Sequence, residues 1–204
     1  MSEVGPDLER QLRLARAGDG TALGQLLDSY RNYLIVLARV QIGRRLQGKV
    51  DASDVVQEAF LQAHRHFGQF RGQSQKELAG WLRQILLSNL LNLVRHYQGC
   101  RRRDPRLERD LAVELDQSSR DLDGALFAKQ STPSQKACKR EQAVLLADAL
   151  SRLPEDYRDV IILRHLEGLP FTDVAARMGR SLDSVDKLWV RALGRLRRLM
   201  REES

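Results

Sequence analysis

The stretch from Leu153 to Arg201 reads LPEDYRDVIILRHLEGLPFTDVAARMGRSLDSVDKLWVRALGRLRRLMR, and it decides the fold of the C-terminal part of the chain. Its apolar spacing predicts two short helices separated by Gly168-Leu169-Pro170, and Gly179 separates the second from a longer third helix. Thr172 and Ser181 are the predicted N-caps of the second and third helices. Two helices joined by such a turn are typical of a helix-turn-helix.

The third predicted helix has two faces. Apolar residues recur at intervals of three and four, as a buried stripe requires: Leu182, Val185, Trp189, Ala192, Leu193, Leu196 and Leu199. The other face carries Ser184, Lys187, Arg191, Arg195 and Arg198. Such a helix can pack on its own domain while its N-terminal side chains reach base edges in a major groove and its basic residues contact phosphates. The alternative interpretation is an amphipathic helix with a solvated basic face.

Composition points to an all-α protein with a polyanionic partner. The chain has 204 residues, a net charge of +7 and 5% aromatic residues, and no convincing strand pattern is present. We predict two small helical domains, residues 1–100 and 140–204, joined by a flexible linker, residues 101–139. The N-terminus lacks a signal peptide and no stretch could span a membrane, which predicts a cytoplasmic protein. Cys100 and Cys138 are predicted to be free thiols, with a redox pair as the alternative.

The stretch from Asp51 to Gly72, DASDVVQEAFLQAHRHFGQFRG, predicts a helix whose first turns present Asp51, Asp54, Gln57 and Glu58 to solvent. Acidic residues at a helix N-terminus are favoured by the helix dipole, by about 0.3–1 kcal/mol each, which is the ordinary explanation. The alternative is an acidic docking patch for a basic partner protein. His64 and His66 are two positions apart on a helix and therefore diverge, so no metal site is predicted there.

A predicted loop with Gly68, Gly72 and Ser74 leads to a helix, WLRQILLSNLLNLVRHYQ, that starts at Trp81. Asn89 falls on its inner side by periodicity. Polar and basic groups on other sides suit melted or single-stranded DNA: Arg83, Ser88, Asn92, Arg95 and His96. Trp81 could stack on a base or belong to the core, and its periodicity favours the core.

Residues 101–139 mix charges with small polar residues, and we expect at most one short helix there, from Pro105 to Asp116. Acidic residues gather in this linker: Glu108, Asp110, Glu114, Asp116, Asp121 and Asp123. The chain contains no glycine-rich phosphate loop, no HExxH and no GxSxG. No catalytic residue, metal or cofactor is therefore predicted.

The stretches DASDVVQEAFLQAHRHFGQFRG and WLRQILLSNLLNLVRHYQ together resemble region two of the bacterial sigma-70 family, in its extracytoplasmic-function (ECF) group. The stretch LSRLPEDYRDVIILRHLEGLPFTDVAARMGRSLDSVDKLWVRALGRLRRL resembles region four of the same group. Within it, SVDKLWVRALGRLRR is similar to the subgroup common in planctomycetes. The two regions occur in the right order and cover most of the chain apart from the linker.

The resemblance implies a factor that directs transcription initiation, with core RNA polymerase and promoter DNA as partners and an anti-sigma factor as a possible third. It implies docking on the β′ clamp coiled coil through Asp51, Asp54, Gln57 and Glu58. It implies recognition and melting of the minus-ten element through Arg83, Ser88, Asn89, Asn92, Arg95 and His96. It implies reading of the minus-thirty-five element through Arg180, Ser184, Lys187, Leu188 and Arg191, in a module that also touches the β flap. The linker would thread towards the RNA exit path.

The sequence departs from the resemblance between Gly72 and Gly80, because this predicted loop lacks the aromatic residues that the group carries before Trp81. The pocket for a flipped base is therefore not transferred. Leu91, Asp186 and Leu188 also stand where the group often has basic residues, so the promoter sequence is not transferred either. Two other functions stay open from the residues alone. One is a stand-alone helix-turn-helix transcriptional regulator, in which the Asp51–Glu58 face has no role. The other is a nucleic-acid-processing enzyme, for which Glu58, His64 and His66 form a poor catalytic set.

Overall fold

The computed structural model of the chain describes residues 4–46, 50–97, 104–124 and 135–202. Every regular element within these ranges is a helix, so the predicted all-α fold is confirmed. The chain divides after Gln117 into two compact units, and each is described by itself. Cys100 lies outside the described residues, and the side chain of Cys138 is not described.

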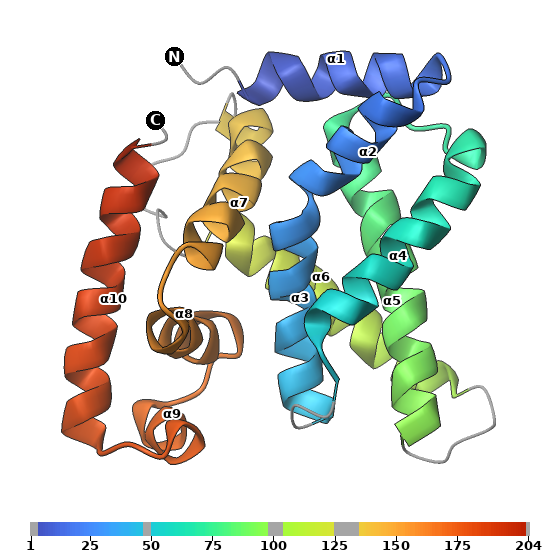
Figure 1. Cartoon of the computed structure of the whole chain (residues 1–204). Coiled ribbons are helices and arrows are strands. Elements are labelled where there is room, and N and C mark those ends of the chain that lie inside the picture. The colour runs from blue at the N-terminus through green and yellow to red at the C-terminus, as the bar shows by residue number, and fades with distance from the viewer. Residues whose placement is uncertain (1–3, 47–49, 98–103, 125–134, 203–204) are drawn as a thin grey trace. The chain divides into compact units, whose positions relative to one another are not determined.

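The first unit is a bundle of antiparallel and crossing helices (Figure 1). Its elements are α1 (Val4–Arg16), α2 (Gly20–Ser29), α3 (Arg31–Arg45), α4 (Ala52–His66), the 3-10 turn η1 (Phe67–Gln69), α5 (Gln75–Tyr97) and the first part of α6 (Pro105–Gly124). Helix α3 packs on both α4 and α5, and α1 packs on α2. Tyr33, Leu37, Leu82 and Leu86 are almost fully buried at the centre of this unit.

Local capping decides where these helices begin. Asp19 caps α2, because its carboxylate accepts hydrogen bonds from the Thr21 and Ala22 backbone N–H groups. Helix α5 starts at Gln75, six residues before the predicted start at Trp81. The cause is a capping box in which Glu77 accepts from the Ser74 backbone N–H at 3.0 Å and the Glu77 N–H donates to Ser74 Oγ at 3.3 Å.

Helix α6 is longer than the sequence predicted. It begins at Pro105 as expected, but it continues to Gly124 instead of ending at Asp116. Leu111 and Leu115 are buried, and the helix therefore has an apolar side that periodicity within a charged stretch did not reveal. Residues 105–117 of the predicted linker are a structured part of the first unit.

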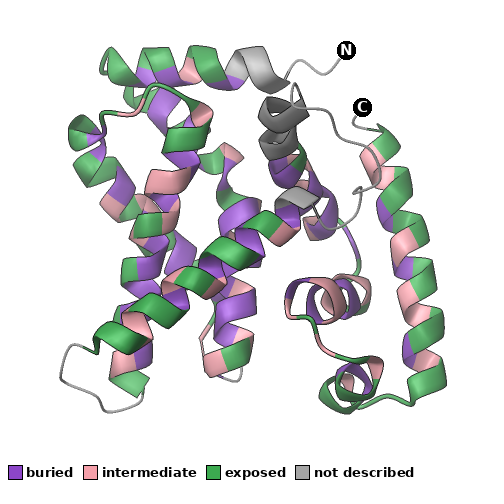
Figure 2. Ribbon diagram, turned by 180° about the vertical axis from the view of Figure 1, so that it is seen from behind, coloured by how far each residue is buried: buried purple, intermediate pink, exposed green. Residues whose placement is uncertain are grey.

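The second unit contains the predicted helix-turn-helix. Its elements are α7 (Gln135–Ser151), α8 (Glu155–Ile161), the single π-turn η2 (Ile162–Leu166), α9 (Phe171–Met178) and α10 (Leu182–Glu202). Helix α7 starts five residues before Arg140, where the second domain was predicted to begin. Helix α10 packs against α7, α8 and α9, and Figure 2 shows buried residues alternating with exposed ones along it.

The turns of this unit lie at the glycine and proline positions that the sequence predicted, with one correction to a helix cap. Gly168 and Gly179 have φ of +75° and +62°, the left-handed conformation that glycine adopts without strain. Ser181 is a cap as predicted, since its Oγ accepts from the Ser184 backbone N–H at 3.3 Å. Thr172 is not a cap, because α9 already starts at Phe171 after Pro170 fixes the extended backbone before it.

Candidate polymerase and nucleic-acid interfaces

The acidic start of α4 is exposed, as the sequence predicted. Asp51 is the N-cap, and its carboxylate accepts from the Ser53 backbone N–H at 2.8 Å. Asp54, Gln57 and Glu58 follow at spacings of three and four and share one solvent-facing side of the helix. The capping role of Asp51 accounts for this residue without a partner protein. Asp54 and Gln57 have no such role among the described residues.

A groove of about 380 Å³ runs between this acidic side of α4 and the middle of α5. It is lined by Val50, Asp54, Val55, Glu58, Gln62, Asn89, Asn92 and Leu93. The structure thus brings together residues predicted for two different partners, polymerase for Asp54 and Glu58 and DNA for Asn89 and Asn92. Apolar walls with acids on the rim suit a partner that offers both an aliphatic and a cationic side chain.

Asn89 is buried in this groove and does not reach solvent, which agrees with its predicted inner position. Its Oδ1 accepts a hydrogen bond from Gln62 Nε2 at 2.8 Å, and the same Gln62 amide donates to Glu58 Oε1 at 3.2 Å. The Asn89 Nδ2 amide has no hydrogen-bond partner in the described part of the chain. Asn89 therefore connects α5 to the acidic side of α4, and its predicted contact with DNA stays untested.

The other predicted minus-ten residues on α5 fall into two groups. Ser88, Asn92 and His96 are exposed, and their spacing of four places them in one stripe along the helix. Arg83 and Arg95 are largely covered, with side chains 14% and 25% exposed. The stripe is open to a single strand, whereas the two guanidinium groups are occupied by other parts of the chain.

Arg83 is held from two sides. One of its terminal N–H groups donates to the hydroxyl of the buried Tyr33 at 3.1 Å, and its Nε lies 3.8 Å from the Asp116 carboxylate of α6. A guanidinium of Arg95 lies 3.9 Å from the Glu108 carboxylate of the same helix. The sequence indicated the arginines as DNA-binding and the acids as part of the linker, but it did not indicate that they pair. Arg83 and Asp116 are 33 positions apart, and Arg95 and Glu108 are 13 positions apart.

In the second unit, the start of α10 presents a mixed set of predicted minus-thirty-five residues. Arg180 is exposed and its guanidinium lies 2.5 Å from Asp156 at the start of α8. The Lys187 ammonium lies 2.6 Å from Asp183 one turn earlier. Ser184 and Leu188 are half-buried, and Arg191 is exposed without a partner in the described part of the chain. Arg191 is thus the cation of this set that is ready for an anion.

The apolar stripe of α10 is only partly buried. Val185, Ala192 and Leu196 form the buried contact, and Trp189 is half-buried. Leu182 is 46% exposed, so its predicted burial is wrong; it is the first residue of the helix, where few neighbours surround it. The basic side carrying Arg195 and Arg198 is exposed as predicted.

Trp189 is fixed by contacts that the sequence did not indicate. Its indole N–H donates to His165 Nε2 at 3.0 Å, and the two rings stack with centroids 5.9 Å apart. Phe171 meets Trp189 edge-to-face, and the Arg164 guanidinium lies over the Phe171 ring. Burial and the nearby Arg164 charge lower the pKa of His165 below its ordinary value of 6.5. This cluster sets the rotation of α10 on η2 and α9.

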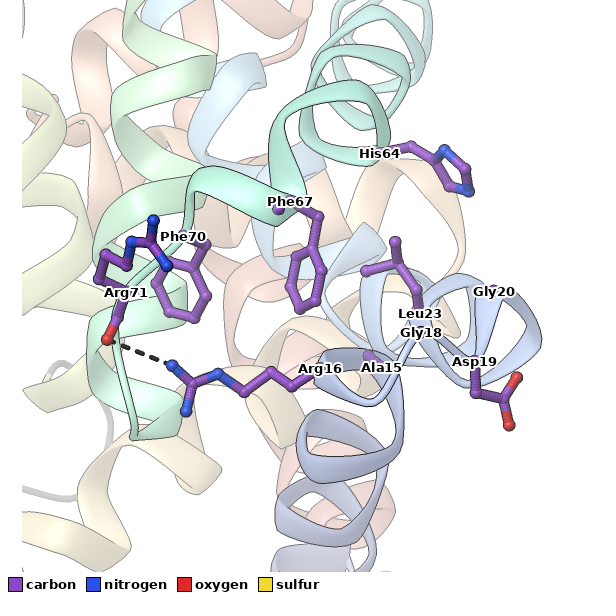
Figure 3. A pocket seen from close by; sticks show the side chains of 11 residues that line it. Ala15, Arg16, Gly18, Asp19, Gly20, Leu23, His64, Phe67, Phe70 and Arg71 are labelled. Atoms are coloured by element: carbon purple, nitrogen blue, oxygen red, sulfur yellow. Dashed lines mark hydrogen bonds between the residues drawn. The ribbon is translucent and has the colours of Figure 1, made fainter.

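A separate hollow of about 420 Å³ lies between the α1–α2 turn and the connection from α4 to α5 (Figure 3). It is lined by Ala15, Arg16, Gly18, Asp19, Gly20, Leu23, His64, Phe67, Gly68, Phe70 and Arg71. Arg16 donates across it to the Arg71 carbonyl at 3.3 Å, so α1 holds the connection in place. No residue of this lining belongs to the predicted site set.

The aromatic residues around that connection settle the role of Trp81. Phe67 and Phe70 both pack on its indole, with ring centroids 6.1 Å and 5.2 Å away. Trp81 therefore belongs to an intramolecular aromatic cluster, as its periodicity favoured. The stretch from Gly72 to Gly80 is not one loop, because its last six residues are the first turns of α5.

Neither a metal site nor a membrane span is found in the described ranges. No group of three or more His, Cys, Asp or Glu side chains converges there in a way that could hold a metal ion. None of the helices described is both long enough and apolar enough to cross a bilayer.

Comparison with known proteins follows the division into two units. Residues 27–99 match the family described as sigma-70 region 2, and residues 143–196 match sigma-70, region 4. The chain is 32% identical over 161 residues to the ECF RNA polymerase sigma-E factor of Haemophilus influenzae, which covers 79% of this chain and 78% of that protein. It is 30% identical over 181 residues to the RNA polymerase sigma-H factor of Pseudomonas aeruginosa, covering 83% and 87% of the two chains.

A solved structure of CnrH in complex with the cytosolic domain of CnrY aligns with 97% of this chain and 99% of its own, at 24% identity and a TM-score of 0.37. At that score the likeness carries no argument about the arrangement of the units. The matches to regions 2 and 4 and the relatives of 30% and 32% identity decide the family. The likeness to the planctomycete subgroup stays a prediction.

Proposed function

This chain belongs to the sigma-70 family, in its extracytoplasmic-function group, and we propose that it does its work through two separate sets of surface residues. It binds core RNA polymerase and promoter DNA and directs promoter-specific initiation of transcription. We assign it no catalytic step of its own, and we expect it to act where RNA polymerase acts, in the cytoplasm. The stand-alone regulator is not favoured, because region 2 matches as well as region 4.

The polymerase-binding set is the solvent-facing side of α4. The observation that carries this assignment is that Asp54, Gln57 and Glu58 form one exposed row beside an apolar groove, in a chain of net charge +7. Neither carboxylate has a cationic partner among the described residues. An unpaired acidic row with an apolar flank fits a basic, partly aliphatic helix, which is the chemistry expected of the β′ clamp coiled coil.

The test is co-purification of the full chain with core RNA polymerase. Reversing the charge of the row in an Asp54→Lys/Glu58→Lys variant should abolish stoichiometric binding, because the rim would then repel a basic partner. The matched control is Glu9→Lys/Asp110→Lys, which reverses two exposed acids elsewhere in the same unit. Equal retention of both variants on the polymerase would refute the α4 assignment. Tight duplex binding by the protein alone, with no polymerase binding, would restore the stand-alone regulator.

The DNA-binding set has one part in each unit. On α10 we propose that the exposed Arg191 contacts the minus-thirty-five element. Arg180 and Lys187 would join it once DNA phosphates replace their carboxylate partners, and Ser184 and Leu188 lie beside them. On α5 the stripe of Ser88, Asn92 and His96 is proposed to contact the melted minus-ten strand. We propose that residues 1–100 and 140–204 carry these two functions, with residues 101–139 between them, of which 105–117 pack with the first unit.

An anti-sigma factor is a further proposed partner. The exposed acidic row of α4 and the exposed basic side of α10 are the surfaces that such an inhibitor would cover. Pull-down of the full chain from cells should recover one protein other than polymerase. Full-strength promoter opening by the purified chain with core polymerase, with no inhibitor recovered, would remove this partner from the proposal.

A further inference from the structure

Four arginines of the first unit face the same helix, α6, and are called here the arginine surface: Arg44 and Arg45 at the end of α3 and Arg83 and Arg95 on α5. Their side chains are 14% to 27% exposed. Arg44 and Arg45 belong to no predicted site. Four guanidinium groups on two packed helices are a natural binding surface for a run of phosphates, because each can donate two hydrogen bonds to an anion.

In this structure the arginine surface is occupied by the first part of α6. Arg45 donates to the Glu114 carboxylate at 2.7 Å, and Arg44 lies 4.0 Å from the same carboxylate. Asp116 faces Arg83 and Glu108 faces Arg95 at 3.8 Å and 3.9 Å. Every arginine of the surface therefore has a carboxylate of α6 within 4.0 Å, and α6 crosses α3 and α5 to bring them there (Figure 1).

The design of α6 explains how it reaches all four arginines. Leu111 and Leu115 are buried and lie one turn apart, so they fix the rotation of the helix. Glu108 and Glu114 flank these leucines and are consequently directed along the arginine surface rather than into solvent. Asp110, on the same helix, is exposed and has no partner among the described residues. The pairing is thus selective for three of the acids in this part of α6.

The pairs are of a kind that a polyanion can displace. The Asp116 and Glu108 side chains are 66% and 37% exposed, so water and salt screen their pairs. Glu114 has one oxygen buried, and its pair with Arg45 is the short one of the four. A nucleic-acid strand presents several phosphates to the same surface and gains from the release of its counterions. The same guanidinium cannot pair fully with a carboxylate and with a phosphate.

We propose that the carboxylates of Glu108, Glu114 and Asp116 are intramolecular competitors of promoter DNA for the arginine surface, and that Arg44 and Arg45 contact the DNA phosphates once these carboxylates are displaced. For Arg83 and Arg95 this inference rests on the proposed function, whereas for Arg44 and Arg45 it goes beyond it. The competition makes nucleic-acid binding by the free protein weaker than its charge would give. DNA binding then depends on whatever moves α6, core polymerase included.

The test uses the full chain without polymerase and a short fluorescein-labelled single-stranded oligonucleotide of mixed sequence, with binding followed by fluorescence anisotropy at low salt. Removing two competing charges in Glu108→Gln/Asp116→Asn should tighten binding by about three- to tenfold, which lies within the range of about two- to thirtyfold for two exposed ion pairs. The matched control Glu9→Gln/Asp110→Asn raises the net charge equally but faces no arginine, and it should change the affinity by about twofold or less. Circular dichroism melting of each variant separates unfolding from weak binding.

A second pair of variants tests the new residues. Arg44→Gln/Arg45→Gln should weaken oligonucleotide binding more in the Glu108→Gln/Glu114→Gln/Asp116→Asn background than in the wild type, because only there is the Glu114 carboxylate that faces the two arginines neutralised. Equal tightening by the acid variant and its control would overturn the competition, and equal effects of the arginine variant in both backgrounds would overturn the role of Arg44 and Arg45. These outcomes are independent of polymerase co-purification, so a failure here and a failure of the α4 assignment are distinguishable.

Discussion

Lowering the pH should destabilise the second unit through His165. The neutral imidazole is required in the folded chain, since its Nε2 lone pair accepts the Trp189 indole N–H at 3.0 Å. Burial and the Arg164 charge hold the pKa of His165 below its ordinary value of 6.5. A histidine with a lowered folded-state pKa contributes stability that is fully present above about pH 6.5 and is lost as the pH falls through the folded-state pKa.

The hydrogen bond sets the scale of the loss in stability. An imidazolium has no lone pair at Nε2, so protonation removes the Trp189 bond as well as placing a charge beside Arg164. The net value of one such hydrogen bond is about 0.5–1.5 kcal/mol, and we expect the free energy of unfolding of the second unit to fall by about that much between about pH 8 and about pH 5. The unfavourable burial of the charge adds to it.

Tryptophan fluorescence can follow this unit alone. The chain has two tryptophans, and a Trp81→Phe background leaves Trp189 as the reporter. Urea unfolding in this background should show a midpoint that falls on acidification, and a further His165→Gln substitution should reduce the fall, because glutamine can accept from the indole and does not titrate. Equal falls with histidine and with glutamine would show that other groups cause the pH dependence and would refute the role given to His165.

Three further predictions test the first unit and α10. Gly72→Ala should lower the free energy of unfolding by about 1–3 kcal/mol, seen as a lower melting temperature of the full chain, because a Cβ there collides with the Phe70 ring. The control Gly68→Ala places its Cβ in open space and should leave the melting temperature unchanged. Leu111→Ala should destabilise the first unit by about 2–5 kcal/mol in urea unfolding, and the exposed Val113→Ala should have little effect; equal effects would mean that α6 does not belong to the core. Arg191→Ala should weaken promoter binding by the polymerase holoenzyme by about 1–3 kcal/mol if its side chain pairs with a base edge, and equal losses on all DNA sequences in competition binding would show a phosphate contact instead.

Local signals in the sequence were sufficient for most of the helix-turn-helix. Gly168, Pro170 and Gly179 each act on their own backbone, through a fixed φ or a left-handed turn, so their effects could be read without tertiary structure. The same kind of signal marks the start of α5, where Ser74 and Glu77 form a capping box. Its spacing is visible in the sequence and predicts the helix six residues earlier than the apolar pattern alone.

Contacts between distant residues could not be predicted in this way. His165 and Trp189 are 24 positions apart, and no periodicity within either helix indicates that their rings stack. From the sequence, the acidic residues of α6 were assigned to a solvated linker, because nothing in the sequence shows which arginine lies opposite each of them. Burial of Leu111 and Leu115 depends on the same unknown partner surface. Charge composition was therefore a good guide to the presence of cationic and acidic surfaces and a poor guide to their pairing.

The structural duties of some site residues limit what mutagenesis can show about promoter contact. Arg83 donates to the hydroxyl of the buried Tyr33, and the Asn89 side chain bonds Gln62 between α4 and α5. Alanine at Arg83 takes a partner from the buried Tyr33 hydroxyl, and alanine at Asn89 removes the link to the half-buried Gln62. Each lost hydrogen bond costs about 0.5–1.5 kcal/mol, so a loss of promoter activity there would follow from a loosened bundle alone.

Asn92 and His96 are exposed and have no such bond in the described part of the chain. Substituting them leaves the packing of α5 intact, and a loss of promoter opening with an unchanged melting temperature would then report contact with DNA itself. If Asn92→Ala and His96→Ala both open promoters as the wild type does, the exposed stripe of α5 is not the reading surface. The arginine surface would then be the candidate for the minus-ten contact.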